Sequence, residues 1–385
     1  MLYHLVNWLQ ELGVDFPGAG LVNYLSFRAI LAAVLSMVIS LSAGKRIIAF
    51  LRKKQIGETI RDLGLQGQME KKGTPTMGGV IIIISVVATT LLVCRLDSIY
   101  TILLLITTLW CGGIGFADDY IKVFKHNKEG MSEKGKLILQ FFLALFIALM
   151  MCFSSFIRTD ELITTIPFIK AHEFDYSILS PFRGQLGVYC SWGIYMVMII
   201  LVILACSNGA NLTDGMDGLA TGTSAIIGIA IGVMAWLSGD ALDAEYLNIM
   251  HIPGSGEVAV YMSAFVGSLI GFLWYNTFPA EVFMGDTGSL TIGGVIGVSA
   301  VLIRKELLLP LLCGIFLVEA VSVIIQRTWF KYTKKKYGTG RRVFLMAPLH
   351  HHYQKKGIPE PRIVTRFWIV GIILAVSTLA LLKIR

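Results

Sequence analysis

Charged residues are scarce in this chain. Only 15% of its 385 residues are Asp, Glu, Lys or Arg, whereas 55% are hydrophobic and the mean hydropathy is +0.71. A typical soluble domain carries about 25% charged residues. So few charges leave too little polar surface for a soluble domain, and the composition indicates an integral membrane protein.

Three further absences narrow the possible classes of protein. No two of the six cysteines have the close spacing of a zinc or redox motif, and all six lie in or beside apolar runs, which indicates packing residues. No Lys or Arg precedes the first apolar run, so we do not expect that run to be a cleaved signal peptide. No nucleic-acid motif accompanies the net charge of +8. The cations flank apolar runs, where they meet lipid headgroups, and we expect no nucleic-acid partner.

Ten apolar runs recur along the chain, and most have the length at which a helix crosses ~30 Å of hydrocarbon. They predict an all-α polytopic membrane protein with about ten transmembrane helices in a single domain, 1–385. The runs are 25–43, 77–94, 99–117, 137–156, 188–206, 220–237, 258–275, 290–303, 307–325 and 363–382. The eighth is short and glycine-rich, so a tilted helix and a hairpin with the ninth run are both open.

The cations indicate the orientation, because Lys and Arg are retained in cytoplasmic loops. One set of loops, with the last counted to Arg366, holds 24 of the 33 Lys and Arg residues. These loops are 44–76, 118–136, 207–219, 276–289 and 326–362. We therefore expect them to be cytoplasmic and to carry the catalytic residues, and we expect both termini to lie outside.

Carboxylates gather in the same loops. Asp118 and Asp119 end the third run, Asp214 and Asp217 lie between the fifth and sixth, and Asp286 lies between the seventh and eighth. Each taken singly could be an ordinary loop-end carboxylate. Five on one membrane face would repel one another unless a cation lies among them, and Asn208 and Asn211 add oxygen ligands. Mg²⁺ held by carboxylates and substrate phosphates fits this pattern.

The same loops contain cations suited to phosphate oxygens. Lys71 and Lys72 precede the GTPTMGG segment, and Lys134 and Lys136 precede the fourth run. Each could instead be an anchor at the membrane surface. Three histidines, 350–352, lie in the last loop beside Pro348, Lys355 and Lys356. They are compatible with a metal-binding tract, a phosphate-facing turn or an exposed loop without function.

Five motifs occur in a fixed order: GTPTMGG, FADDY, NLTDGMDGLA, MGDTGS and PLHHHY. Together they resemble the phospho-N-acetylmuramoyl-pentapeptide transferase family, also called translocase I, within the polyprenyl-phosphate N-acetylhexosamine-1-phosphate transferases. The resemblance runs from about Lys45 to the end of the tenth run. Met216 and Tyr353 depart from the family pattern, without a change of charge. The resemblance implies transfer of phospho-N-acetylmuramoyl-pentapeptide from UDP to undecaprenyl phosphate in the bacterial inner membrane, giving lipid I and UMP.

The resemblance also implies residue roles. Asp286 would be the Mg²⁺ ligand and Asp118 the base. The remaining catalytic set would be Asp119, Asn208, Asp214, Asn276, Lys136, His350 and His351. The substrate-binding set would be Lys72, Gly215, Asp217, Phe283 and His352, with Phe283 and Asp217 on the nucleoside.

Alternatives remain open at this point. Within the superfamily, a GlcNAc-1-phosphate transferase is the nearest rival, and the three histidines and GTPTMGG favour the muramoyl-pentapeptide enzyme. An ion-coupled transporter also has intramembrane carboxylates, but its site lies near the midplane. In this chain, Glu319 is the only carboxylate that falls inside one of the ten apolar runs. Direct attack by the lipid phosphate and a two-step route through an aspartyl intermediate are both compatible with the residues, and a homodimer is allowed.

Overall fold

The computed structural model describes residues 1–13, 17–54, 73–125, 127, 130–153, 162–166 and 173–383. Its longer helices are α1 (Leu2–Glu11), α2 (Leu25–Lys53), α3 (Gly79–Val93), α4 (Ile99–Phe124), α5 (Glu133–Phe153), α6 (Gly184–Thr213), α7 (Leu219–Gly239), α9 (Gly256–Asn276), α10 (Gly285–Leu302), α12 (Gly314–Tyr337) and α14 (Glu360–Leu381). Shorter elements are η1 (Ala19–Asn23), β1 (Ile163–Thr165), β2 (Glu173–Asp175), η3 (Tyr176–Leu179), α8 (Ala241–Leu247), η4 (Glu306–Leu308), α11 (Leu309–Leu312) and α13 (Leu349–Lys355).

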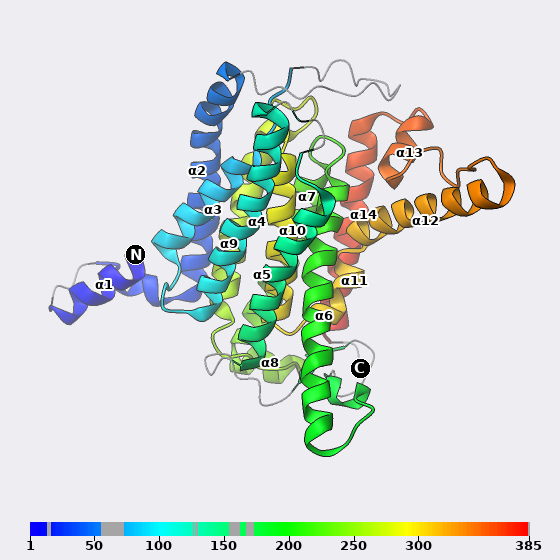
Figure 1. The fold of residues 1–385 in the computed structure, drawn as a ribbon. Helices are drawn as coiled ribbons and strands as arrows, with labels where there is room; N and C mark the ends of the chain where they lie inside the picture. The colour runs from blue at the N-terminus through cyan, green and yellow to red at the C-terminus, as the bar shows by residue number, and fades with distance from the viewer. Residues whose placement is uncertain are drawn as a thin grey trace.

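The long helices form a bundle, which confirms the all-α polytopic prediction (Figure 1). Among the described residues, eight helices are long and apolar enough to cross a membrane: α2, α4, α5, α6, α7, α9, α10 and α14. The apolar helix α3 has only 15 residues. Helices extend well into the loops expected from hydropathy, because α4 continues through both aspartates to Phe124 and α6 continues to Thr213.

The ninth apolar run is present, but two helices form it instead of one continuous helix. Residues Glu306–Leu312 and Gly314–Tyr337 meet at Cys313 with a bend of 76°. Pro310 and Gly314 flank the break, and both residue types favour sharp changes of helix direction. As a result α12 leaves the bundle and projects sideways from it (Figure 1).

The eighth run forms the central helix α10, which contacts α3, α4, α6 and α7. Its glycines permit this close packing. A side chain at Gly293 would overlap the backbone of Cys206 in α6, and one at Gly294 would overlap the sulfur of Cys111 in α4. The glycine-rich composition therefore reflects helix contacts on all sides of α10.

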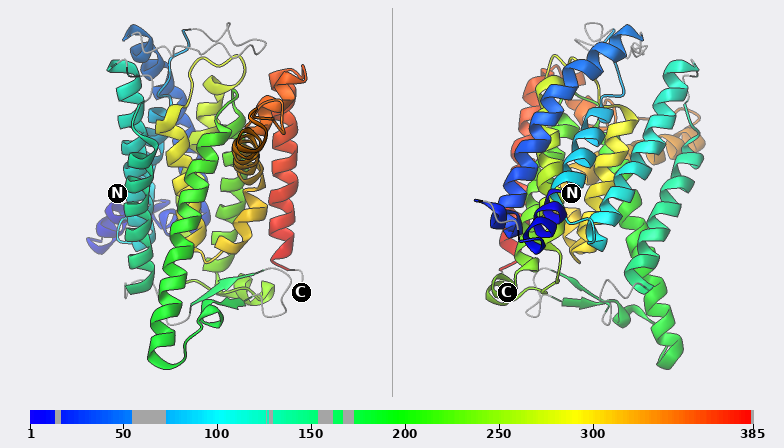
Figure 2. Two further views of the ribbon diagram at one scale, coloured as in Figure 1. Left: turned by 45° about the vertical axis from the view of Figure 1, so that its right-hand side comes forward. Right: turned by 90° about the vertical axis from the view of Figure 1, so that its left-hand side faces the viewer.

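A buried ion pair and a hairpin organise the other end of the bundle. Arg28 in α2 and Glu257 in α9 form a bidentate pair at 2.7 and 2.9 Å, with both side chains almost fully buried. The two-stranded hairpin β1–β2 packs on the turn after α10, where Lys305 donates to Thr165 Oγ1 at 2.6 Å. Figure 2 shows this hairpin beside the start of α6, at the end opposite to α13.

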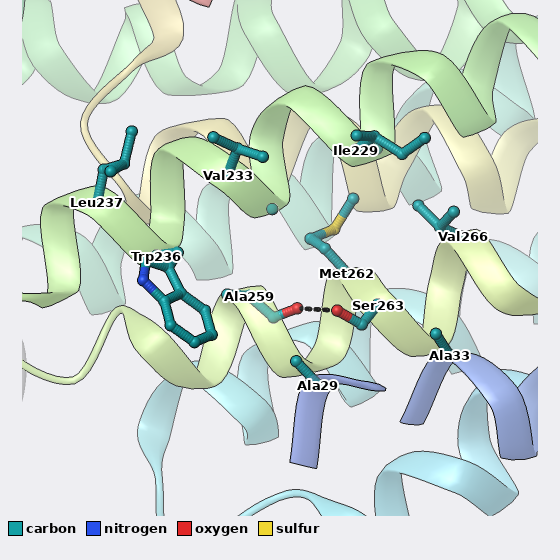
Figure 3. Close-up of a pocket in the computed structure, with 12 residues that line it drawn as sticks. Ala29, Ala33, Ile229, Val233, Trp236, Leu237, Ala259, Met262, Ser263 and Val266 are labelled. Atoms are coloured by element: carbon teal, nitrogen blue, oxygen red, sulfur yellow. Dashed lines mark hydrogen bonds between the residues drawn. The ribbon is translucent and has the colours of Figure 1, made fainter. Parts of the chain in front are cut away.

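An apolar cavity of about 370 Å³ lies between α2, α7 and α9 (Figure 3). Small residues such as Ala29, Ala33 and Gly232 line it together with Trp236 and Met262. Its lining lies near the start of α2, the end of α7 and the start of α9, whereas the motif residues lie at the opposite ends of these helices.

The tight α2–α9 contact gives a stability prediction. A side chain at Gly267 in α9 would overlap the carbonyl oxygen of Ala33 in α2. We expect Gly267→Ala to destabilise the protein by roughly 1–3 kcal/mol, as overpacking does, and to lower Tm in detergent. The matched control is Gly113→Ala in α4, where no described atom lies within 4 Å. Gly113→Ala should leave Tm unchanged or raise it, and equal losses in both variants would contradict the packing argument.

Candidate functional site

The motif carboxylates gather at one end of the helix bundle. Asp118 and Asp119 lie near the end of α4, Asp214 and Asp217 lie in the turn between α6 and α7, and Asp286 lies in the first turn of α10. The histidine triplet lies in α13, toward the same end (Figure 1). The structure thus brings segments that are far apart in sequence to one face of the bundle.

Two lysines stand between Asp118 and Asp286. The Lys122 ammonium lies 2.6 Å from Asp118 Oδ2 and 3.2 Å from Asp286 Oδ2. The Lys136 ammonium lies 2.9 Å from Asp118 Oδ1 and 2.5 Å from Asp286 Oδ2. The Asp118 side chain is fully buried, whereas that of Asp286 is 17% exposed. The two cations offset the repulsion between the carboxylates, and Asp286 is the more accessible acid.

Asp119 holds the start of α10. Its carboxylate accepts hydrogen bonds from the backbone N–H of Asp286 at 3.2 Å, and from the Thr287 N–H and hydroxyl at 2.9 and 2.6 Å. Gly285 has a φ of 72°, and a side chain there would press on the Asp119 carboxylate. Asp119 therefore fixes where the α10 turn places Asp286.

The aspartates fit a divalent cation. One oxygen each from Asp118, Asp119 and Asp286 lies within 4.8 Å of the others. Mg²⁺ prefers such hard oxygen ligands at about 2.0–2.1 Å, so ligands on opposite sides of it are about 4 Å apart. Small side-chain movements would reach this geometry. Three aspartates against two lysines also leave one negative charge in excess, which favours a cation.

Asn211 joins this cluster, and Asn208 does not. The Asn211 amide donates to Asp286 Oδ1 and to Ser289 Oγ, both at 2.9 Å. Asn208 lies one turn earlier in α6, where its amide donates to Gln140 Oε1 at 2.9 Å and to the Leu204 carbonyl at 2.8 Å. Asn208 therefore contacts α5 and its own helix instead of the aspartates.

The GTPTMGG segment packs against the backbone that leads to Asp286. The Phe283 N–H donates to the Pro75 carbonyl and the Gly78 N–H donates to the Phe283 carbonyl, both at 2.8 Å. Phe283 is half-buried. Lys72, expected on the substrate, lies outside the described residues.

The turn between α6 and α7 is held by buried polar groups. Asp217 accepts from the Ala280 N–H at 3.0 Å, and its own N–H donates to Glu360 at 2.8 Å. Asn276 accepts from the Gly218 N–H and the Thr221 hydroxyl, and donates to the Val282 carbonyl. These bonds give Asn276 a structural task, since it links the turn to the loop before α10. Asp214 is half-buried at the end of α6.

The three histidines have different surroundings. His350 is fully buried against Gly215, whereas His351 is half-buried with its Nδ1 3.1 Å from Gln354 Oε1. His352 Nδ1 accepts from the Leu345 N–H at 3.1 Å. Burial, followed by the nearby Lys356 charge, lowers the pKa of His352, which agrees with a neutral ring that accepts this hydrogen bond. The three histidines therefore have separate environments and do not form one cluster of ligands.

Sequence reasoning missed Lys122 and Gln326. Lys122 follows Asp118 by four residues in α4, and this helical spacing was a usable signal. Gln326 accepts from the N–H groups of Val343 and Phe344 at 3.0 and 2.9 Å and so shapes the segment that leads to α13. No local motif marks it.

Two family models match the chain. The model of glycosyl transferase family 4 matches residues 101–304, and the model of phospho-N-acetylmuramoyl-pentapeptide-transferase signature 1 matches residues 71–83.

Curated relatives match over the full length of both chains. Proteins named phospho-N-acetylmuramoyl-pentapeptide-transferase are 53% identical in Parabacteroides distasonis, 52% identical in Flavobacterium psychrophilum and 47% identical in Bacteroides thetaiotaomicron.

Removal of Lys122 tests whether the cluster binds a metal, with Tm as the readout, so that no enzyme assay is needed. Lys122→Met should destabilise the protein by roughly 1–2 kcal/mol, below the 3–5 kcal/mol of a fully buried pair, because the Lys122 side chain is 36% exposed. Added Mg²⁺ should raise the Tm of this variant more than that of the parent, since it would replace the lost positive charge. Lys125→Met, an exposed cation at the end of the same helix, is the control. A Mg²⁺-dependent rise in Tm that is no larger in Lys122→Met than in the parent and in Lys125→Met would contradict metal binding between the aspartates.

Proposed function

The chain belongs to the phospho-N-acetylmuramoyl-pentapeptide-transferase family, and we propose that the cluster of Asp118, Asp286, Lys122 and Lys136 is the centre at which it performs that transfer. The transfer moves phospho-N-acetylmuramoyl-pentapeptide from its UDP carrier to undecaprenyl phosphate and forms lipid I and UMP. The observation that carries the proposal is the convergence of these four charges from three helices. An anionic donor and an anionic acceptor both need cations at the same point.

The site faces the cytoplasm in this proposal. The helix ends that carry the motifs also border the loops richest in Lys and Arg, and such loops stay inside. The soluble nucleotide then reaches the cluster from the cytoplasm. The lipid acceptor keeps its chain in hydrocarbon and brings its phosphate to the span ends, where Asp118 and Asp286 lie.

The lysines neutralise charge during the transfer. The acceptor is a phosphomonoester with a second pKa near ~6, so it is largely dianionic at neutral pH. Its oxygen attacks the phosphorus that carries the sugar, and the bond from that phosphorus to the UMP oxygen breaks. Positioning and charge neutralisation dominate such reactions. Lys122 and Lys136 can turn from the aspartates to the phosphate oxygens, while Asp118 takes up any remaining proton or orients the acceptor.

Asp286 is the proposed Mg²⁺ ligand. Asp118 is fully buried, and Asp119 is occupied by three hydrogen bonds at the start of α10. Asp286 is the accessible carboxylate of the three, so it is the residue that would hold the cation. A bound Mg²⁺ supplies Lewis-acid stabilisation of the charge on the leaving UMP.

The donor nucleoside is placed beside the turn between α6 and α7. Phe283 is the proposed stacking partner of uracil, and Asp217, already fixed by the Ala280 N–H, is the proposed acceptor for a base N–H. Gly215 lies exposed in the same turn, next to His350, where a larger residue would not fit. The donor pyrophosphate would then extend from this turn toward Asp286.

A donor assay tests the activity. Purified protein in detergent should release UMP from the UDP-linked muramoyl-pentapeptide when undecaprenyl phosphate is present, and not from UDP-GlcNAc. Turnover of UDP-GlcNAc alone would assign the chain to the GlcNAc-1-phosphate branch. Capture of a phospho-sugar on an aspartate would establish the two-step route in place of direct attack.

Substitution of two aspartates separates the metal ligand from the base. Asp286→Asn keeps the size and one oxygen but loses the charge, so activity should fall by several orders of magnitude together with Mg²⁺ affinity. Asp118→Asn should keep Mg²⁺ affinity near that of the parent. Its rate loss should lie within the ~10² to 10⁴ range of general-base removal and shrink as pH rises above the acceptor pKa.

The measurement is a Mg²⁺ titration of both variants from about pH 6 to about pH 9, on either side of neutral, with UMP release as the readout. If Asp118→Asn loses Mg²⁺ affinity and Asp286→Asn retains it, the two roles are reversed.

A further inference from the structure

Glu319 is a buried carboxylate within an apolar helix. It lies in the second turn of α12, just after the bend at Cys313, and is completely inaccessible to solvent. An ionisable residue at such a position is costly and usually has a specific partner and a functional reason. The cluster around Asp286 does not include it, so the reason has to be found elsewhere.

The partner of Glu319 is His350. The two carboxylate oxygens of Glu319 accept a hydrogen bond from the His350 backbone N–H at 3.2 and 3.4 Å. The His350 Nδ1 lies 3.2 Å from Glu319 Oε2, at an ion-pair distance but without straight hydrogen-bond geometry. Both side chains are fully buried. Hydrogen bonds in active sites are often poorly aligned without substrate and tighten when it binds.

The other edge of the imidazole faces the turn between α6 and α7. A side chain at Gly215 would overlap His350 Nε2, so this nitrogen lies directly against the turn that holds Asp214 and Asp217. Nε2 has no hydrogen-bond partner within the described part of the chain. A buried polar atom without a partner is rare in folded proteins. Here a substrate oxygen or a water would satisfy it.

We propose that Glu319 is a positioning residue for the transfer, which acts through His350. A carboxylate next to Nδ1 favours the tautomer with its proton on Nδ1, because that N–H can donate to it. Nε2 is then fixed toward the substrate beside Gly215, as acceptor in the neutral ring and as donor to a phosphate oxygen in the protonated ring. Glu319 contacts no substrate itself. This inference deepens the proposed function, since it assigns the orientation of a group at the same site.

The bend at Cys313 explains how Glu319 reaches this position. The segment from Glu306 to Leu312 follows the bundle, and α12 turns away from it by 76°. The first turns of α12 therefore pass beneath α13, and Ser322 in the next turn is also buried. A straight ninth helix would continue along the bundle instead of crossing under α13.

A double-mutant cycle tests the proposal. Glu319→Gln keeps the size and an acceptor for the His350 N–H but removes the charge. It should lower kcat on the order of 10- to 100-fold, the range for groups that orient an active-site histidine, with KM for the nucleotide donor changed less than about twofold, since uniform binding is untouched. Glu319→Asp keeps the charge and should recover part of kcat.

Non-additivity is the decisive result. In a His350→Ala background, Glu319→Gln should cost less than about twofold, because no imidazole remains to be oriented. In a His352→Ala background, used as the matched control, Glu319→Gln should keep its full cost. Multiplicative losses with His350→Ala would show that Glu319 acts on the fold and not through His350. The parent protein in the same assay reports separately on whether the transfer itself occurs.

A second measurement determines the tautomer in the parent protein and uses one variant only to assign the resonance. In protein labelled with ¹⁵N-histidine, the ring of His350 should show the Nδ1–H tautomer at a pH where it is neutral, and the missing resonance in His350→Gln identifies it. An Nε2–H tautomer would overturn the proposal, since the proton would then point away from Glu319.

Discussion

Two lysine ammonium groups between two aspartates hold the working end of this bundle together. Asp118 and Lys122 come from α4, Lys136 from α5 and Asp286 from α10. Three of the four ion pairs therefore join different helices, and only Asp118–Lys122 lies within one. Without the cations, the carboxylates would repel each other in a medium where charge is poorly screened. The ends of three helices are therefore placed by charge balance, and the two lysines that provide it are partly exposed.

This placement depends on how closely α10 approaches its neighbours. Gly115 in α4 lies so near Asp286 that a side chain would overlap the backbone there, and Gly79 of α3 meets Gly288 in the same way. Asp119 then caps the start of α10 with three hydrogen bonds. Glycine contacts and the hydrogen bonds to Asp119 thus set the position of Asp286.

The sequence predicts the parts that rest on local rules. Hydropathy identifies an all-α membrane protein, cation counts group the loops that carry the motifs, and the motifs single out Asp118, Asp119, Asp286 and His350. Hydropathy alone does not predict the break at Cys313, because it carries no direction; Pro310 and Gly314 beside the break are the signal that the sequence does contain. The sequence also cannot decide between Asn208 and Asn211, since the helix rotation that points Asn211 at Asp286 arises from packing against α10.

Accessibility separates the charged groups that support the fold from those that can do chemistry. Arg28 and Glu257 satisfy each other in a bidentate pair and are almost fully buried, so that pair has no capacity left for a substrate. Asp286 is paired as well, but its lysines are partly exposed and can exchange a carboxylate for a phosphate. Glu319 is intermediate, because it is buried like Glu257 but its partner His350 has a second nitrogen that faces the α6–α7 turn. An ion pair whose donors and acceptors are all used stabilises the fold. A pair that keeps an unused donor or acceptor can also orient a bound ligand.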